Sequence, residues 1–238
     1  MKYSYALNII LSVIVIMLIG SKVVEMVKNP KQEVVESSND EIIDYSKNTK
    51  KKIAASPEVY PTPTTVVGTE VDGKINWIAI AHIGHIGRGN LMISSGKDHY
   101  SNIGIKKNMT LSVNIVSESM LISADYVGLV SGADADKSKV FTPFYGSLVG
   151  APMIKESPLT MECRVVDIYD TEHHDNFILE VVGTYADPSI LGENGKVDYM
   201  KFKPILFEMP NRRYFKTGEY VGKAWGEGKN HPNYKQNK

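Results

Sequence analysis

The stretch "TTVVGTEVDGKINWIAIAHI", Thr64 to Ile83, holds two strand-like runs on either side of an Asp-Gly pair. Valine, isoleucine, threonine and tryptophan dominate both runs, and these residue types are enriched in strands. Asp72-Gly73 is a dipeptide typical of the tight turn between two antiparallel strands. The stretch therefore predicts a β-hairpin.

Further strand patterns follow this hairpin along the chain. In "MTLSVNIV", Leu111, Val113 and Ile115 alternate with the polar Ser112 and Asn114, which places the two sets on opposite faces of a strand. The stretch "MECRVVDIYDTEHHDNFILEVVGTYAD" has the pattern of two strands around a polar turn. Short extended pieces are expected in "KPILFEM" and "RRYFKTGEYVGKAW".

Helices are few. "SNIGIKKN" predicts about two turns with Ser101 as N-cap. "SESMLISADYVGLVSG" predicts a longer helix capped by Ser117 and ending before Gly132. One face of it holds Met120, Leu121, Ala124, Val127 and Gly128. Many short strands with two helices between them favour a mainly β fold, a barrel or sandwich with helical insertions. Alternating βαβ units, a G-x-G-x-x-G fingerprint and a P-loop are absent, which argues against a Rossmann fold.

Composition excludes some functions. The 238 residues include 27 basic and 27 acidic side chains, so no net charge draws the chain to nucleic acid. The single cysteine, Cys163, cannot form an internal disulfide. It lies in a strand pattern, where a small buried residue is favoured over a reactive thiol.

The N-terminus differs from the rest. "ALNIILSVIVIMLIG", Ala6 to Gly20, carries no charge, and with Tyr3 and Tyr5 its apolar length is near the ~17 residues at the low end for a membrane-spanning helix. An uncleaved membrane anchor is favoured, a cleaved signal peptide is second and a buried core helix third. The lysines on both flanks leave the side of the membrane open.

Four regions are therefore expected. Residues 1–28 form a membrane anchor or signal segment, and residues 29–56 form a polar linker. Residues 57–228 form the globular domain, and residues 229–238 a polar tail.

Two histidine pairs suggest metal binding only weakly. His82 and His85 are three residues apart, and His173 is adjacent to His174, but no Cys, Asp or Glu cluster completes either pair. A strand-end pair and an exposed hairpin tip are the favoured interpretations. Without a G-x-S-x-G elbow or an H-E-x-x-H motif, we predict no metal ligand and no side-chain acid, base or nucleophile.

The polar connection "ISSGKDHYSNI", Ile93 to Ile103, has the composition of an anion site. A helix that starts at Ser101 would present unpaired N–H groups, and Gly96 would let the backbone approach a ligand. Hydrogen-bond donors and positive charge would come from Ser94, Ser95, Lys97, His99 and Ser101. From local spacing alone, an ordinary surface loop with an N-cap is favoured.

The order of the motifs carries more information. "DYVGLVSGADADK" followed by "APMIKESPLTMEC" resembles the flavin reductase-like, flavoredoxin-type family, and the resemblance covers nearly all of residues 57–226. It implies an FMN-binding split β-barrel, usually a homodimer with the flavin near the subunit interface.

The resemblance also implies flavin-binding residues. The strand around Asn76, Ala79, Ile80, Ala81 and His82 would run beside the isoalloxazine ring, with Asn114 close to it. The loop with Ser94, Ser95, Lys97, His99 and Ser101 would hold the FMN phosphate. The chain departs from the family at His99, where Arg or Lys is usual, and at Ala79 and His82, where Thr and Trp are common.

The function implied is an FMN-dependent oxidoreductase that passes electrons from NAD(P)H or a redox partner through the flavin. The alternative is a non-catalytic flavin- or ligand-binding module tethered to the membrane. An anchored structural domain with no cofactor is a third hypothesis.

Overall fold

The computed structural model describes residues 50–234. The predicted membrane segment, residues 1–28, lies outside the described residues, as do residues 29–49 of the predicted linker and residues 235–238 of the predicted tail. Among the described residues, no helix is both long enough and apolar enough to cross a membrane.

The predicted hairpin is confirmed. Strands β2 (Thr65–Val71) and β3 (Lys74–Ile80) pair antiparallel, with Val71 opposite Lys74. The two residues between them have positive φ, 50° at Asp72 and 78° at Gly73. Two consecutive positive φ angles give a turn whose twist matches that of the flanking strands, so the local sequence determines this part of the fold.

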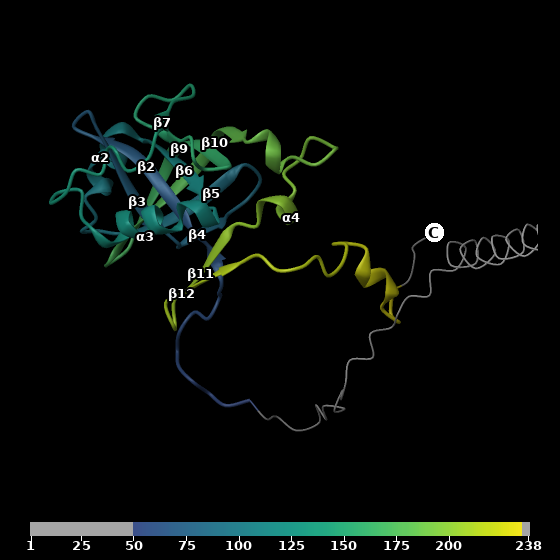
Figure 1. Cartoon of the computed structure of the whole chain (residues 1–238). Helices are drawn as coiled ribbons and strands as arrows, with labels where there is room; N and C mark the ends of the chain where they lie inside the picture. Colours follow the sequence, from purple (N-terminus) through teal and green to yellow (C-terminus); the bar gives the residue numbers. More distant parts are fainter. Residues whose placement is uncertain (1–49, 235–238) are drawn as a thin grey trace, which may run out of the picture. The chain divides into compact units, whose positions relative to one another are not determined.

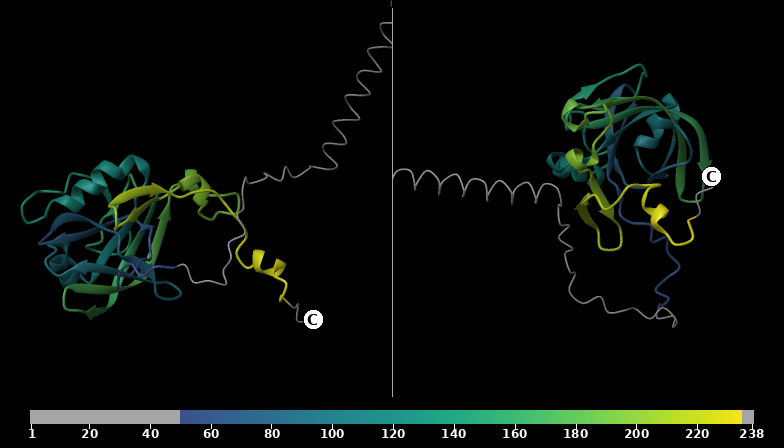
Figure 2. Two further views of the ribbon diagram at one scale, coloured as in Figure 1. Left: turned by 90° about the horizontal axis from the view of Figure 1, so that it is seen from below. Right: turned by 90° about the vertical axis from the view of Figure 1, so that its right-hand side faces the viewer.

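The hairpin forms one edge of a seven-stranded antiparallel sheet with the order β3-β2-β6-β9-β10-β5-β4. The other strands are β4 (Ile83–His85), β5 (Asn90–Gly96), β6 (Thr110–Ile115), β9 (Leu159–Asp170) and β10 (His174–Ala186). Strands β9 and β10 are the two strands predicted around a polar turn. The sheet curls into a half-barrel (Figures 1 and 2), so the mainly β fold with short helices is that of a split barrel.

One face of the sheet holds the larger hydrophobic core. Leu111 and Val113 of β6 are fully buried there with Phe177 and Leu179 of β10, which confirms the alternation predicted for β6. The single thiol, Cys163, lies in the same cluster, and burial, followed by the charge of Glu162, raises its pKa to about 12. Cys163 is therefore the buried strand residue that the sequence favoured.

Two helices cover the sheet (Figure 1). Helix α2 (Ser101–Asn108) meets β2 so closely that a Cβ at Gly104 would lie 2.3 Å from the Glu70 carbonyl oxygen. The 3₁₀ turn η1 (Glu118–Met120) leads into α3 (Leu121–Leu129), where a Cβ at Gly128 would lie 2.9 Å from Ala79 Cβ on β3. These close approaches explain why glycine occupies both positions.

One predicted N-cap position is wrong, and the other is right but forms no capping hydrogen bond. Ser101 is the first residue of α2 and its N-cap is Tyr100, because the Ser101 hydroxyl instead accepts a hydrogen bond from Asn76 Nδ2 at 2.7 Å. Ser117 stands at the N-cap of η1, but its side chain pairs with Ser119 Oγ at 3.0 Å and makes no capping bond.

The C-terminal part adds a three-stranded sheet, in which β11 (Ile205–Glu208) lies between β1 (Thr62–Pro63) and β12 (Arg213–Lys216). The extended pieces predicted near the C-terminus are thus confirmed for these residues. The remaining elements are β7 (Pro143–Phe144), β8 (Met153–Ile154), η2 (Pro188–Ile190), α4 (Tyr199–Phe202) and η3 (Glu227–Asn230).

Candidate functional site

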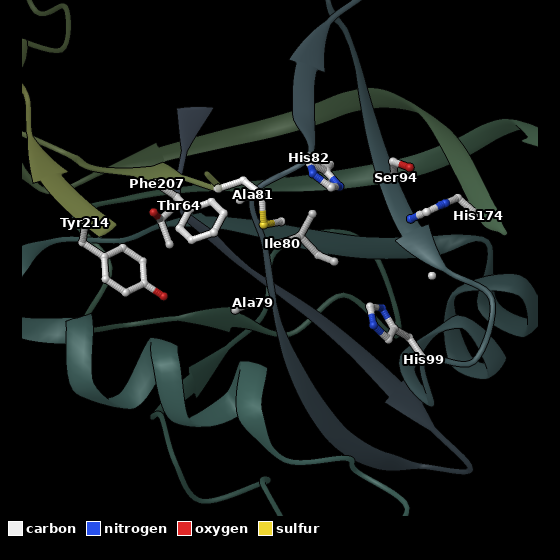
Figure 3. Close-up of a pocket in the computed structure, with 12 residues that line it drawn as sticks. Thr64, Ala79, Ile80, Ala81, His82, Ser94, His99, His174, Phe207 and Tyr214 are labelled. Carbon is white, nitrogen blue, oxygen red and sulfur yellow. The ribbon is translucent and has the colours of Figure 1, made fainter. Parts of the chain in front are cut away.

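A cavity of about 310 Å³ opens where the end of β3 passes β5, the start of β10 and the β11–β12 hairpin. Figure 3 shows His99 and His174 on one side of it and Phe207 and Tyr214 on the other. We call it the ring cavity, and it is lined by Thr64, Ala79, Ile80, Ala81, His82, Ser94, Gly96, His99, His174, Phe207, Met209 and Tyr214. Its walls are mostly apolar, with a few polar groups.

A second cavity of about 240 Å³ shares Ala79 and His99 with the first. We call it the lysine cavity, because Lys137 lies in its wall. The rest of its lining comes from Ile78 of β3, from residues 98–101 before and within α2 and from residues 127–132 at and after the end of α3. The two cavities therefore meet at Ala79 and His99.

Seven of the eleven predicted flavin-binding residues line these cavities. Ala79, Ile80, Ala81, His82, Ser94 and His99 line the ring cavity, and Ser101 lines the lysine cavity. The tertiary structure thus brings the end of β3 close to the Ser94–Ser101 segment, in which Ser94, Ser95 and Gly96 end strand β5 rather than form the expected loop.

The other four predicted residues do not line either cavity. Asn76 lies beneath Ser101 and donates to its hydroxyl, and Ser95 is buried behind His99, 3.0 Å from its Nδ1. Asn114 is fully buried elsewhere, donating to the Val66 carbonyl and accepting from the Ile154 amide, both at 2.9 Å. Its side chain supports the packing of the sheet.

Lys97 lines neither cavity. Its ammonium pairs with Asp170 at 2.7 Å, and both side chains are exposed to solvent. The hydrogen bond to Asp170 raises the pKa of Lys97, in spite of partial desolvation. Because this charge is already paired, it offers little to an anion in the lysine cavity.

Lys137 is a cation that the sequence analysis missed. It is 3% exposed, and its Nζ donates to the carbonyl oxygens of Val127 at 3.0 Å and Val130 at 2.9 Å. Burial lowers its pKa from 10.5 to about 8, because the charged form is poorly solvated. The only signal was its place in "SGADADKSK", a polar run that is typical of a solvated loop.

His99 is held neutral. Burial lowers its pKa below the ordinary 6.5, and the nearby His174 and Lys137 lower it further, while Asp98 acts in the opposite direction. At pH 7 the ring is therefore largely uncharged, and the positive charge near the lysine cavity comes from Lys137.

His174 was also missed as a lining residue. An exposed hairpin tip was predicted for His173 and His174, which is correct for His173 and wrong for His174. The register of β10 on β5 sets His174 opposite Gly96, which turns its ring toward His82, 6.4 Å away between ring centroids. Among the described residues, no group of histidine, cysteine or acidic side chains could hold a metal ion.

The remaining lining residues come from segments far away in the sequence. Tyr214 donates its hydroxyl to Asp125 Oδ1 at 2.7 Å; burial and this bond raise its pKa to about 12. Thr64 is 3% exposed, and within the described residues its hydroxyl oxygen has no hydrogen-bond partner. A buried unpaired hydroxyl in a cavity wall points to a ligand, since such a group is costly to leave unsatisfied.

Comparisons with known proteins agree with this architecture. The family model described as "Flavin reductase like domain" matches residues 58–214. A flavoredoxin from Methanosarcina acetivorans is 38% identical, with a TM-score of 0.73 over 76% of this chain and 97% of that one. The flavoredoxin of Desulfovibrio vulgaris is 32% identical, with a TM-score of 0.70 over 75% of this chain and 99% of that one.

A more distant structure shares the fold alone. It is an FMN-binding protein from Thermus thermophilus with bound 1-cyclohex-2-enone, 19% identical, with a TM-score of 0.64 over 73% of this chain and 99% of that one. A comparison with curated proteins found no match. The length of the family match and the two flavoredoxin structures decide the assignment: the chain belongs to the flavin reductase-like domain family, and a flavin-binding redox function follows from that membership.

Proposed function

We propose that the protein is an FMN-dependent oxidoreductase that passes electrons from NAD(P)H or a redox partner through the flavin. The observation that carries the proposal is the pair of cavities that meet at Ala79 and His99. One has apolar walls and a few polar groups, and the other has a buried lysine. Their combined size lies within the range of roughly 300–1,000 Å³ that is usual for small-molecule sites.

The ring cavity suits the isoalloxazine end of FMN. Phe207, Met209 and Tyr214 supply apolar and aromatic surface opposite the end of β3. A flat ring with polar edges needs a few hydrogen-bonding groups in such a slot, and the unpaired Thr64 hydroxyl is one. The residues present therefore fit the ring.

The lysine cavity suits the phosphate end. An ammonium group has three donors, and the two bonds from Lys137 to backbone carbonyls leave the third for a ligand. The Ser101 hydroxyl accepts from Asn76, so its own proton is free to donate to an anion. A desolvated cation and a hydroxyl donor are groups that bind phosphate.

Bound FMN would supply the electron-transfer chemistry. The side chains that line the two cavities would hold FMN, orient it and keep water from one side of it. Tyr214, fixed by its bond to Asp125, and Lys137, fixed by two carbonyls, would reorganise little on binding.

The test uses the full-length protein purified in detergent. We expect a yellow protein, or one that FMN titration turns yellow, and we expect NADH or NADPH to bleach the flavin band under anaerobic conditions. A colourless protein that does not bind FMN would refute the proposal. If dithionite bleaches the bound flavin but neither nicotinamide nucleotide does, and no redox partner can be found, the alternative of a non-catalytic flavin-binding module is favoured.

We also propose a homodimer and an N-terminal membrane anchor. The dimer rests on the family resemblance, and the anchor rests on the uncharged Ala6 to Gly20 segment. Light scattering of the purified protein tests the first, and a monomer at micromolar concentration would contradict it. Membrane fractionation with a C-terminal reporter tests the second, and recovery in the high-speed supernatant would contradict it.

A further inference from the structure

A chain of hydrogen bonds behind the ring cavity runs from Asp175 to His99. Asn102 is 3% exposed, and its Nδ2 lies 3.0 Å from Asp175 Oδ2 and 2.9 Å from the Gly96 carbonyl oxygen. Ser95 Oγ lies 2.7 Å from Asn102 Oδ1 and 3.0 Å from His99 Nδ1. The chain links β10, α2 and β5 to the residue where the two cavities meet.

Counting protons along this chain fixes the direction of each bond. The Asp175 carboxylate, which is also paired with Lys106 at 2.7 Å, and the Gly96 carbonyl can only accept. An amide group that contacts both of them must therefore be the donor, so the NH₂ of Asn102 must face them and its oxygen must face Ser95. The opposite amide orientation would set an oxygen against two acceptors.

The same count fixes the histidine. Ser95 has one hydroxyl proton, and Asn102 Oδ1 takes it. Ser95 Oγ can therefore only accept from His99, which means that Nδ1 of His99 carries a proton. Because burial, His174 and Lys137 keep the ring neutral, Nε2 is then unprotonated.

Nε2 lies on the ring edge away from Ser95. The edge formed by Cε1, Nε2 and Cδ2 passes Gly96, where a Cβ would lie 3.5 Å from Nε2. His99 lines both cavities, and Figure 3 shows its ring projecting into the ring cavity. This series of hydrogen bonds thus leaves the unprotonated Nε2 of His99 as a hydrogen-bond acceptor where the two cavities meet.

We propose that His99 is a specificity-determining residue whose Nε2 accepts a hydrogen bond from a ribityl hydroxyl of the flavin. The proposal rests on the proposed FMN function, because the ribityl chain is the part of FMN that joins the ring to the phosphate. It replaces the expectation that His99 serves as a cation for the phosphate, a role that Lys137 fills better.

The first experiment measures the tautomer without any flavin. Long-range ¹H–¹⁵N correlation spectra of the full-length, histidine-labelled protein at pH 7.5 separate a protonated ring nitrogen from an unprotonated one. The six histidines are distinguished by the signal lost in His99→Phe. We expect Nδ1–H with a bare Nε2, and in Ser95→Ala we expect a mixture of tautomers. An Nε2–H or doubly protonated ring in the wild type would overturn the proposal.

The second experiment compares lumiflavin, riboflavin and FMN, which contain the ring alone, the ring with the ribityl chain, and the phosphate in addition. We expect His99→Phe to weaken riboflavin and FMN equally, by about tenfold, as for one buried hydrogen bond, and to leave lumiflavin unchanged. His99→Gln, which keeps an acceptor, should lose less than His99→Phe with both larger ligands.

His85→Phe is the matched control, because His85 is an exposed histidine of β4 that lines neither cavity. If His99→Phe weakens the binding of FMN alone, His99 contacts the phosphate. If it weakens lumiflavin as much as the other two ligands, His99 contacts the ring. Either result overturns the proposal. Failure of the wild type to bind any of the three flavins would instead refute the proposed function, while the spectra still report the histidine.

Discussion

The two cavities differ in how they are built. The ring cavity is walled by side chains from β3, β5, β10 and the β11–β12 hairpin, and its unpaired polar group is a neutral hydroxyl, that of Thr64. The lysine cavity is walled by the end of β3, the start of α2 and the end of α3, and a desolvated cation held by two backbone carbonyls lies in it. Under the proposed function the first would select by shape and the second by charge, so that substitutions in the two should affect different parts of the same ligand.

The largest effect is expected from Lys137→Met. Loss of a buried, charge-assisted hydrogen bond should weaken FMN by about 10- to 100-fold. Riboflavin, which has no phosphate, should bind almost as before. Isothermal titration with both ligands measures the difference.

Two other lysines provide controls for that experiment. Lys97 is paired with Asp170 at the surface, and Lys139 is exposed two residues beyond Lys137. Replacing either with Met should change FMN affinity by less than about threefold. A larger loss in Lys97→Met than in Lys137→Met would assign the phosphate to the loop before α2, as the sequence analysis expected.

A pH titration should give the next largest effect. The pKa of Lys137 in the flavin-free protein is about 8, so the preference for FMN over riboflavin should fall by about tenfold between pH 7 and pH 9. A phosphate monoester, with a second pKa of about 6, keeps its charge over this range. In Lys137→Met the preference should not change with pH, and a parallel fall there would exclude Lys137 as the titrating group.

The same lysine predicts the opposite trend for stability. Because folding lowers its pKa from 10.5, the folded state disfavours the charged form, and the full destabilisation is present below about pH 8. This contribution should vanish as pH rises from 8 to 10.5. Denaturant unfolding of wild type and Lys137→Met, compared at pH 7.5 and 10, isolates it.

Thr64→Val should give a smaller effect, at the ring cavity. Removal of a hydroxyl that binds the ring should weaken lumiflavin, riboflavin and FMN alike by about fivefold. Removal of an unsatisfied buried hydroxyl should also raise the free energy of unfolding of the flavin-free protein by about 1 kcal/mol.

Thr69→Val is the matched control for this substitution. Its hydroxyl is also buried without a partner among the described residues, but Thr69 lines neither cavity. It should stabilise the protein to a similar degree and leave flavin binding unchanged. Equal flavin affinities for the two variants would show that Thr64 does not contact the ring.

The smallest effect is expected from Tyr214→Phe. The aromatic wall stays, but the bond to Asp125 is lost, which should cost about 1 kcal/mol of stability and change flavin affinity by less than about twofold. Thermal unfolding and FMN titration measure the two quantities. A loss of affinity that matches Tyr214→Ala would mean that the hydroxyl, rather than the ring, forms the useful part of the wall.

Local patterns predicted much of the barrel. Asp72-Gly73 determined a hairpin because its turn needs two positive φ angles, and the alternation in β6 determined which side chains enter the core. Ser117 occupies the predicted N-cap position, but the cap predicted at Ser101 is wrong for a nonlocal reason. Asn76, 25 residues earlier, occupies the Ser101 hydroxyl, and no local rule includes that bond.

Local sequence patterns predicted only some of the residues of the candidate site. The polar residues between Ser94 and Ser101 stood out in the sequence, and Ser94, His99 and Ser101 are among those that line the cavities. Lys137 and Thr64 did not stand out, since each is a single ordinary residue in its own segment. Lys97 seemed the natural cation because of its neighbours along the chain, but Asp170 on β9 pairs with it in space.

The sequence by itself determined the strands, the main hairpins and the family, because these follow from the period-two alternation of side chains, from turn chemistry and from the order of motifs. Only the tertiary structure decided which cation is desolvated and which way the protons point along Asp175, Asn102, Ser95 and His99. Burial and hydrogen-bond direction depend on neighbours that come from distant strands, and no spacing along the chain encodes them.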